Sequence, residues 1–278
     1  MTPEVQWFHL GTHRLQHLKW GEQGSSVVLL AGMGHTAHIF TELAPLLAQN
    51  HVVYALSRRG HGKSEMPPEG DFTPQALAED LLGFVEGLNL QNILLMGHSI
   101  AGNEMTLAAS MQPERFAGLV YLDAAYDRSG VLDRIRQDPQ IQQSKPQPQT
   151  LEGFRQDASA QYGFWNAALE ADLQDQLVLK EGRLQLRPEW QNMLRDTHTF
   201  APDYRAIRCP ALAIYAPLMG HPVFLEQVML PWQDRSIRQF SEQCAQGQVQ
   251  WWHSENHQFF AAQPAKVLQK LLLWKTNI

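Results

Sequence analysis

Short apolar segments alternate with amphipathic ones along the chain. The apolar segments have the length and composition of buried β-strands, and they lie at 27–32, 52–56, 93–97, 119–123 and 211–216. Between two of them, residues 74–88 carry a stripe of apolar side chains at helical spacing, formed by Leu77, Leu81, Leu82, Val85 and Leu88. Strand, helix and strand in this order predict an α/β fold, with a mostly parallel central sheet and helices on both faces.

The alternation also predicts how the chain is divided. Gly11 and Gly21 bracket a different pattern at the start, which indicates a leading antiparallel pair of strands. The strand rhythm stops after Tyr126 and resumes near Cys209. We therefore expect a core of residues 1–127 and 206–278, with a mostly helical cap inserted at 128–205; one helical pattern of this cap covers 164–179.

Composition excludes several classes of protein. The 278 residues are 44% hydrophobic and 18% charged, with a net charge of −6, which is ordinary for a globular protein and unfavourable for nucleic-acid binding. No signal peptide or membrane span is visible, so we expect a cytoplasmic protein whose partner is a small-molecule substrate and neither nucleic acid nor a membrane. Cys209 and Cys244 are expected to be reduced packing residues.

The segment GHSIAG at 97–102 is the strongest candidate for chemistry. It follows the apolar segment ILLM and precedes a helical pattern. A serine nucleophile must be raised above its sheet, and a tight strand-to-helix turn does this by holding the serine at positive φ. Such a turn needs small neighbours, which here are Gly97, Ala101 and Gly102. Five-residue patterns of this kind also occur by chance, but the strand before it and the helix after it favour Ser99 as a nucleophile.

Three further segments extend this observation into a family resemblance. They are RRGHGKS at 58–64, LVYLDAAYD at 119–127, and a histidine close to the C-terminus. Together with GHSIAG they make the chain resemble the α/β-hydrolase fold family, of the esterase-like type with a cap after the sixth strand. The RRGHGKS segment has Ser57 before it, where the family often has aspartate, and Arg58 and Arg59 are expected to brace loops.

The resemblance implies a catalytic histidine late in the chain, between the last strand at 249–252 and a last helix at 258–274. His257 has this position, whereas His253 falls at the end of the strand. The spacing of these two histidines, and that of His9, His13 and His17, could suggest a metal pair. Both sets lie outside predicted helices and lack clustered carboxylates, so no metal is expected.

The acid of the triad is harder to place. Most members of the family carry it after the seventh strand, where this chain has Met219, and no carboxylate occurs between Asp203 and Glu226. Some relatives take the acid from the end of the sixth strand, where this chain has Asp123. We predict Asp123 as the acid that orients the histidine, ahead of Glu226 and then Asp127, although an aspartate at this strand end can also cap a loop.

Two backbone N–H groups are needed to hold the oxyanion. The resemblance implies that Ile100, after the nucleophile, supplies one, and that Met33 supplies the other from the glycine-rich loop AGMG at 31–34. Substrate contacts are expected from Gly32, His98 and Trp165. His35 and His38 would line the pocket or begin a helix.

These residues predict a serine hydrolase that cleaves a small ester through a Ser99, His257 and Asp123 triad and an acyl-enzyme, without a cofactor. A serine at 99 argues against the carboxylate chemistry of dehalogenases and epoxide hydrolases. Lactone opening, perhydrolysis and carbon–carbon bond hydrolysis use the same triad and stay open. A second hypothesis is a ligand receptor or degenerate hydrolase that binds a small apolar molecule, which Met219 at the usual acid position would support.

Overall fold

One eight-stranded sheet forms the centre of the computed structural model, which describes residues 1–130, 133, 148–187, 190–197, 199–218, 222–253 and 256–275. The strands follow the order β1-β2-β4-β3-β5-β6-β9-β10. They are β1 Glu4–Leu10, β2 His13–Trp20, β3 Ser25–Leu30, β4 His51–Leu56, β5 Ile93–His98, β6 Phe116–Leu122, β9 Ala211–Tyr215 and β10 Gly247–Trp251. β2 pairs antiparallel with both β1 and β4, and all other neighbouring strands of this sheet pair parallel. The predicted strands, the leading antiparallel pair and the α/β fold class are confirmed.

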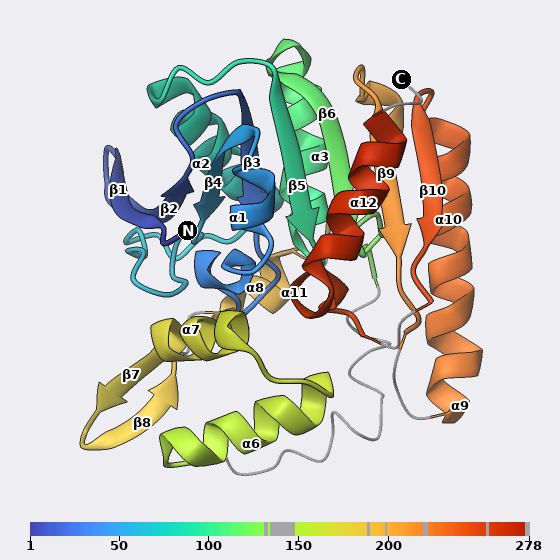
Figure 1. Ribbon diagram of the computed structural model, residues 1–278. Helices are drawn as coiled ribbons and strands as arrows, with labels where there is room; N and C mark the ends of the chain where they lie inside the picture. Colours follow the sequence, from blue (N-terminus) through green and yellow to red (C-terminus); the bar gives the residue numbers. More distant parts are fainter. Residues whose placement is uncertain are drawn as a thin grey trace.

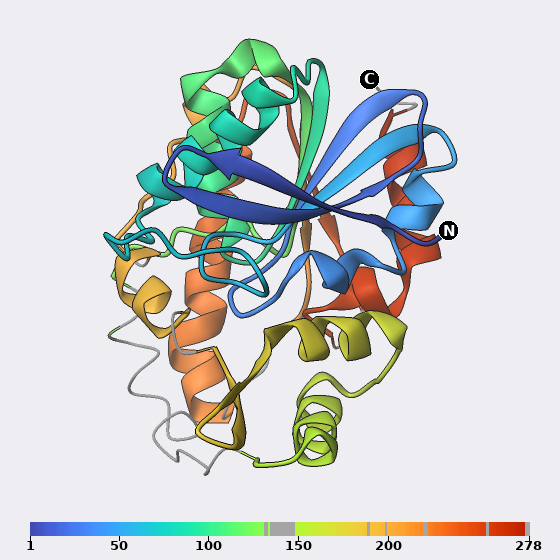
Figure 2. The same cartoon turned by 90° about the vertical axis from the view of Figure 1, so that its left-hand side faces the viewer.

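Helices cover both faces of this sheet, as Figure 1 and Figure 2 show. One face carries α2 Pro74–Gly87, α3 Ala101–Met111 and α10 Leu230–Gln243; the other carries η1 Ala37–Phe40, α1 Ala44–Leu47, α11 Phe259–Ala262 and α12 Pro264–Lys275. The strands alternate between the two cores, because successive side chains of a strand point to opposite faces. In β5, Leu95 packs in the cluster of α2 and α3, whereas Leu94 and Met96 pack in the cluster of η1, α1 and α12.

The remaining elements are short or lie in the middle of the chain. They are η2 Pro113–Arg115, α6 Leu151–Tyr162, α7 Ala167–Gln176, β7 Leu177–Lys180, β8 Arg183–Leu186, α8 Trp190–Thr197, η3 Tyr204–Ala206, α9 Pro222–Phe224 and the π-helix η4 Leu225–Met229. In the described residues, no helix is long and apolar enough to cross a membrane. Cys209 and Cys244 are both buried and free, and burial raises the pKa of each thiol to about 11.

The middle segment, residues 151–186, lies beyond the carboxyl ends of the parallel strands. Figure 1 shows α6, α7 and the β7–β8 hairpin below the arrowheads of the sheet. Side-chain amides join this segment to the last part of the chain: Asn166 Nδ2 donates to the Ala261 carbonyl at 2.9 Å, and Asn256 Nδ2 donates to the Tyr162 carbonyl at 3.0 Å. The limits of the cap at 128 and 205 stay a prediction.

The predicted helix at 164–179 is too long. It ends at Gln176, and residues 177–180 form β7, which pairs antiparallel with β8. The turn between them has two residues at positive φ, Glu181 at 52° and Gly182 at 75°, which is typical of a two-residue hairpin. The segment Leu177–Leu179 fits a helix or a strand equally well by its pattern, so Gly182 was the signal that could have separated the two.

The predicted last helix at 258–274 is divided in two. α11 ends at Ala262 and α12 begins at Pro264. Proline has no N–H and fixes φ, so it suits the first position of a helix and interrupts the interior of one. The break allows α11 to run across the edge of the sheet next to His257, while α12 covers the face (Figure 1).

Candidate active site

Ser99 occupies a strained turn between β5 and α3. Its φ is +55°, in the left-handed region that costs a residue with a side chain about 1–3 kcal/mol. The turn is possible because its neighbours are small. A Cβ on Gly102 would lie 1.9 Å from the Ala124 carbonyl oxygen, and a Cβ on Gly97 would lie 2.6 Å from the Met105 sulfur. The predicted turn geometry around Ser99 is therefore present.

Asp123 follows β6 directly and is completely buried. Its φ is also positive, at +49°. Its Oδ2 lies 2.5 Å from Nδ1 of His257. Its Oδ1 accepts hydrogen bonds from the Tyr126 hydroxyl at 2.5 Å and from the Ala216 N–H at 3.2 Å. Both oxygens thus have donors, which is what a buried carboxylate requires.

The other two candidate acids have different surroundings. Glu226 lies in η4 and is exposed. The carboxylate of Asp127 accepts from the N–H and the hydroxyl of Ser129, at 2.9 and 2.6 Å. Of these three acids, Asp123 is the one hydrogen-bonded to His257. Met219, whose place in the chain made the acid uncertain, lies outside the described residues.

His257 is held in the segment between β10 and α11 by its backbone as well as by Asp123. Its carbonyl oxygen is 3.2 Å from Nε2 of His98, and the two rings have centroids 4.3 Å apart. The side chain is 38% exposed, so its free nitrogen, Nε2, can be reached. His253 is exposed at the end of β10 and has no described contact with Asp123.

His98 is a buried and neutral histidine. It is 1% exposed, and burial together with the nearby His257 and His35 lowers its pKa well below the ordinary value. Because a carbonyl only accepts, Nε2–H of His98 is the donor to His257. His98 is thus bonded to the backbone of His257, and its contact with substrate stays a prediction.

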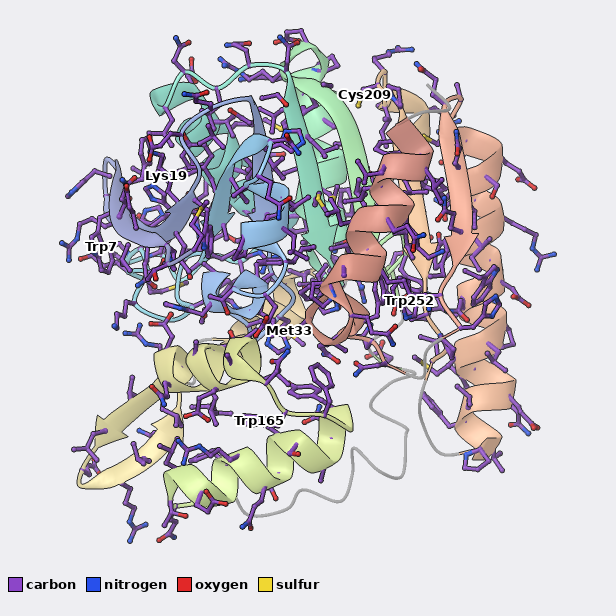
Figure 3. All side chains as sticks on the ribbon, in the orientation of Figure 1. Trp7, Lys19, Met33, Trp165, Cys209 and Trp252 are labelled. Atoms are coloured by element: carbon purple, nitrogen blue, oxygen red, sulfur yellow. The ribbon has the colours of Figure 1, made fainter. Side chains whose placement is uncertain are left out.

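The loop after β3 packs directly against the serine turn. A Cβ on Gly32 would lie 2.7 Å from His98 Nδ1 and 3.3 Å from Ser99 Cβ. In the described structure neither the Met33 N–H nor the Ile100 N–H has a hydrogen-bond partner. The Met33 and Ile100 side chains belong to the same apolar cluster. Figure 3 shows Met33 at the lower end of the sheet, facing the segment that carries Trp165.

His61 holds this loop in place through a hydrogen bond, and it was not among the site residues predicted from the sequence. Its Nδ1–H donates to the Arg59 carbonyl at 3.0 Å, so its Nε2 accepts the Gly34 N–H at 3.2 Å. Burial, with the charge of Arg58, lowers the pKa of His61 to about 4 and keeps it neutral. Its position in the RRGHGKS segment was the signal that could have indicated it. In the same segment, Arg58 forms an ion pair with Glu104 and Arg59 forms one with Asp80, so both arginines brace loops as expected.

Asp172 of α7 connects the middle segment to the same loop. It accepts from the Thr36 N–H at 2.6 Å, from the Thr36 hydroxyl at 3.0 Å and from His35 Nδ1 at 2.7 Å. His35 is thus a buried bridge between the loop and the segment that carries α6 and α7, and the Tyr162 hydroxyl lies 3.5 Å from its other nitrogen. No local pattern marks Asp172, because its partners are 136 residues away in sequence.

A cavity of about 230 Å³ lies between α6 and α7. Apolar and aromatic side chains, Trp165 and Tyr162 among them, form most of its wall, and Asp157, Asp172 and two glutamines add polar groups. Ser99 and His257 do not line it. In the described part of the chain, no three histidine, cysteine or carboxylate side chains are grouped so that they could hold a metal ion.

The described structure contains no hydrogen bond between Ser99 Oγ and His257. Such bonds are often long in a resting enzyme and shorten in the substrate complex. What the structure brings to one edge of the sheet is the strained serine, two free N–H groups and a histidine bound to a buried carboxylate. The roles of these residues in a reaction stay a prediction.

The chain is similar in sequence to known hydrolases. A zebrafish (Danio rerio) serine hydrolase-like protein is 29% identical over 148 residues, which are 48% of this chain and 45% of that protein. An N-formylmaleamate deformylase from Pseudomonas putida is 29% identical over 110 residues, 40% of this chain and 41% of the relative. The matched regions thus span less than half the length of these two relatives.

The comparison with solved structures covers nearly the whole chain. A crystal structure of E-2-(acetamidomethylene)succinate hydrolase matches with a TM-score of 0.77 and 17% identity, and covers 97% of both chains. The family model described as "Alpha/beta hydrolase family" matches residues 27–270, which include the serine turn, the aspartate after β6 and the late histidine. The chain belongs to the alpha/beta hydrolase family.

Proposed function

We propose that this hydrolase cleaves small esters through an acyl-enzyme on Ser99. The observation that carries the proposal is the meeting of two strained strand ends. Ser99, at φ +55°, follows β5, and Asp123, at φ +49°, follows β6 and binds His257 Nδ1 at 2.5 Å. Residues with such backbone strain cluster at active sites.

The reaction follows from the free atoms of the site. Ser99 Oγ attacks the ester carbonyl carbon while His257 Nε2 takes its proton, and the Met33 and Ile100 N–H groups stabilise the oxyanion. The tetrahedral intermediate collapses, the bond to the alcohol oxygen breaks, and His257 returns the proton to the leaving alcohol. Water then attacks the acyl-enzyme by the same route, and the acid and free Ser99 are released. Asp123 keeps the proton of His257 on Nδ1 and stabilises the imidazolium.

The cavity between α6 and α7 supports a small substrate with an apolar part. Its volume of about 230 Å³ suits a group of several carbon atoms, and Trp165 and Tyr162 supply aromatic walls. His35 lies between this cavity and the serine turn: it contacts Tyr162, and its ring centroid is 6.2 Å from that of His98. The part of the substrate that does not react would lie there.

The test is labelling with a fluorophosphonate, followed by hydrolysis of 4-nitrophenyl esters of graded acyl length. The wild type should be labelled and active, and Ser99→Ala should lose labelling and roughly 10⁴ to 10⁶ in kcat. Ser110→Ala, near the end of the same helix, is the matched control and should keep both. Because one relative is named a deformylase, an N-formyl substrate belongs in the same panel.

Failure of the folded wild type to react with the fluorophosphonate would contradict the proposal. It would favour the second hypothesis, a receptor or degenerate hydrolase that binds a small apolar molecule. Equal labelling of the wild type and Ser99→Ala would show that another residue is the nucleophile.

A further inference from the structure

Arg128 is a buried cation without an anionic partner in the described structure. The residue is 8% exposed, and its Nε has no hydrogen-bond partner. No described carboxylate lies within ion-pair distance of it, whereas the buried Arg58 and Arg59 each lie 2.6 Å from a carboxylate oxygen. Buried charges are normally paired, because leaving water costs free energy that an opposite charge and hydrogen bonds can offset. The partner of Arg128 is therefore missing from the described part of the resting enzyme.

Two aromatic rings fix the position of this guanidinium. Its central carbon lies 5.5 Å from the ring centroid of Tyr126 and 5.9 Å from that of Trp232. The two rings are stacked on each other, with centroids 4.5 Å apart, and Gln233 Nε2 donates to the Tyr126 hydroxyl at 2.8 Å. Contact with ring faces stabilises a cation but occupies none of its N–H groups. The planar fork of N–H donors thus stays available for an acceptor such as a carboxylate.

The same loop carries Arg128 and the acid of the active site. Asp123 and Arg128 are five residues apart, and Tyr126 contacts both: its hydroxyl donates to Asp123 Oδ1 and its ring lies beneath Arg128. The charge of Arg128 also contributes to the low pKa of His98, as a smaller cause than burial and the two neighbouring histidines. Burial lowers the pKa of Arg128 itself, but an arginine remains charged at neutral pH.

We propose that Arg128 binds a carboxylate of the substrate, so that this enzyme selects esters that carry a second, anionic group. This inference rests on the proposed esterase function and adds its substrate class: half-esters of dicarboxylic acids or their equivalents. The alternative is that Arg128 acts only on Asp123 as a distant counter-charge. In that case its loss would slow every substrate alike.

The test compares anionic with neutral substrates of the same length. The anionic set is the mono-4-nitrophenyl esters of succinic, glutaric and adipic acid, and the neutral set is the corresponding methyl diesters, with spontaneous hydrolysis subtracted. The wild type should prefer at least one anionic ester in kcat/KM. Arg128→Met keeps most of the stem and removes the charge, and it should lower the ratio of anionic to neutral kcat/KM by about 10²-fold.

Two further variants separate this role from others. Arg235→Met removes an exposed arginine of α10 that lines a pocket beside Asp127 and Trp232, and it should leave the ratio unchanged. Arg128→Lys keeps the charge without the planar fork and should lower the ratio by a smaller factor. If Arg128→Met does not fold, the ratio of anionic to neutral kcat/KM in Arg128→Lys tests the proposal instead.

Three results would overturn the inference. The first is a wild type without preference for any anionic ester, and the second is a ratio that stays the same in both Arg128 variants while both substrate sets slow equally. Either leaves the esterase standing if the fluorophosphonate still labels Ser99. The third is a wild type that is not labelled at all, which overturns the esterase and the carboxylate site together.

Discussion

Two single residues, Ser99 and Asp123, carry backbone strain at the ends of neighbouring strands. Both have positive φ, an angle that aspartate tolerates better than most residues with a side chain and that serine adopts less easily. The Asp123 N–H donates to the Ile214 carbonyl at 2.7 Å, so the sheet itself holds the aspartate in place while its side chain reaches His257. Two strand ends of the parallel sheet, after β5 and after β6, thus carry a positive φ at the residue whose side chain leaves the sheet edge.

We expect Asp123→Asn to fold and to lose on the order of 10⁴ in kcat, because an amide favours the wrong histidine tautomer. Steady-state hydrolysis of 4-nitrophenyl esters measures the change, and circular dichroism checks the fold. Glu226→Gln and Asp127→Asn are matched controls that should stay near the wild-type kcat. The assignment is wrong if Asp123→Asn keeps a near-wild-type rate while either control abolishes it.

The loop after β3, which carries Met33, is held in place by neighbouring segments. The loop after β3 places Gly32 against the serine turn, and the loop after β4 holds Gly34 through His61. Asp172 of α7 binds the other end of the first loop at Thr36. The Met33 N–H is thus left without a partner between two fixed points, which is the condition for an oxyanion donor that needs no rearrangement.

If this arrangement serves catalysis, replacing His61 should act on kcat. His61→Leu removes the acceptor of the Gly34 N–H and should lower kcat by about 10-fold to 10²-fold, since loss of a whole oxyanion donor costs 10²–10³. KM should change little. His61→Gln, which offers an amide oxygen at a similar distance, should recover part of the rate. A purely structural role predicts equal losses in both variants, or a change in thermal stability without a change in kcat.

The whole molecule keeps several histidines neutral by burying them. Burial lowers the pKa of His17, on β2, to about 4, and the pKa of His61 falls to about 4 as well. In the unfolded chain a histidine titrates near 6.5, so between pH 6.5 and 4 the unfolded state binds more protons than the folded one. Stability therefore falls as the pH falls through this window.

We expect the free energy of unfolding to decrease by about 2 kcal/mol for each of these two histidines between pH 7.5 and 5.0. Urea unfolding at the two pH values measures it. His17→Leu should reduce the pH-dependent loss by its share, whereas His253→Gln, at an exposed position, should not. An unfolding free energy that is the same at both pH values would contradict the assignment of neutral buried histidines.

Residue patterns were enough to predict most of the strands and helices and the residues proposed for the site. The short apolar segments identified the parallel strands, because a strand that is buried on both faces consists almost entirely of apolar residues. The spacing of small residues identified the turn at Ser99, because the close approach of Gly102 to Ala124 permits no side chain. Local patterns failed where they were ambiguous, at the β7–β8 hairpin, and where a single proline interrupted a helix, at Pro264.

Local patterns in the chain do not show which side chains meet, because the partners come from distant segments. Asp123 and His257 are 134 residues apart, and Thr36 and Asp172 are 136 apart, so no local pattern could select these pairs from other acids and donors. The choice depends on strand order, which brings the ends of β3, β5, β6 and β10 to one edge. It depends also on burial, which separates the enclosed Asp123 from the exposed Glu226 and leaves Arg128 without a described partner.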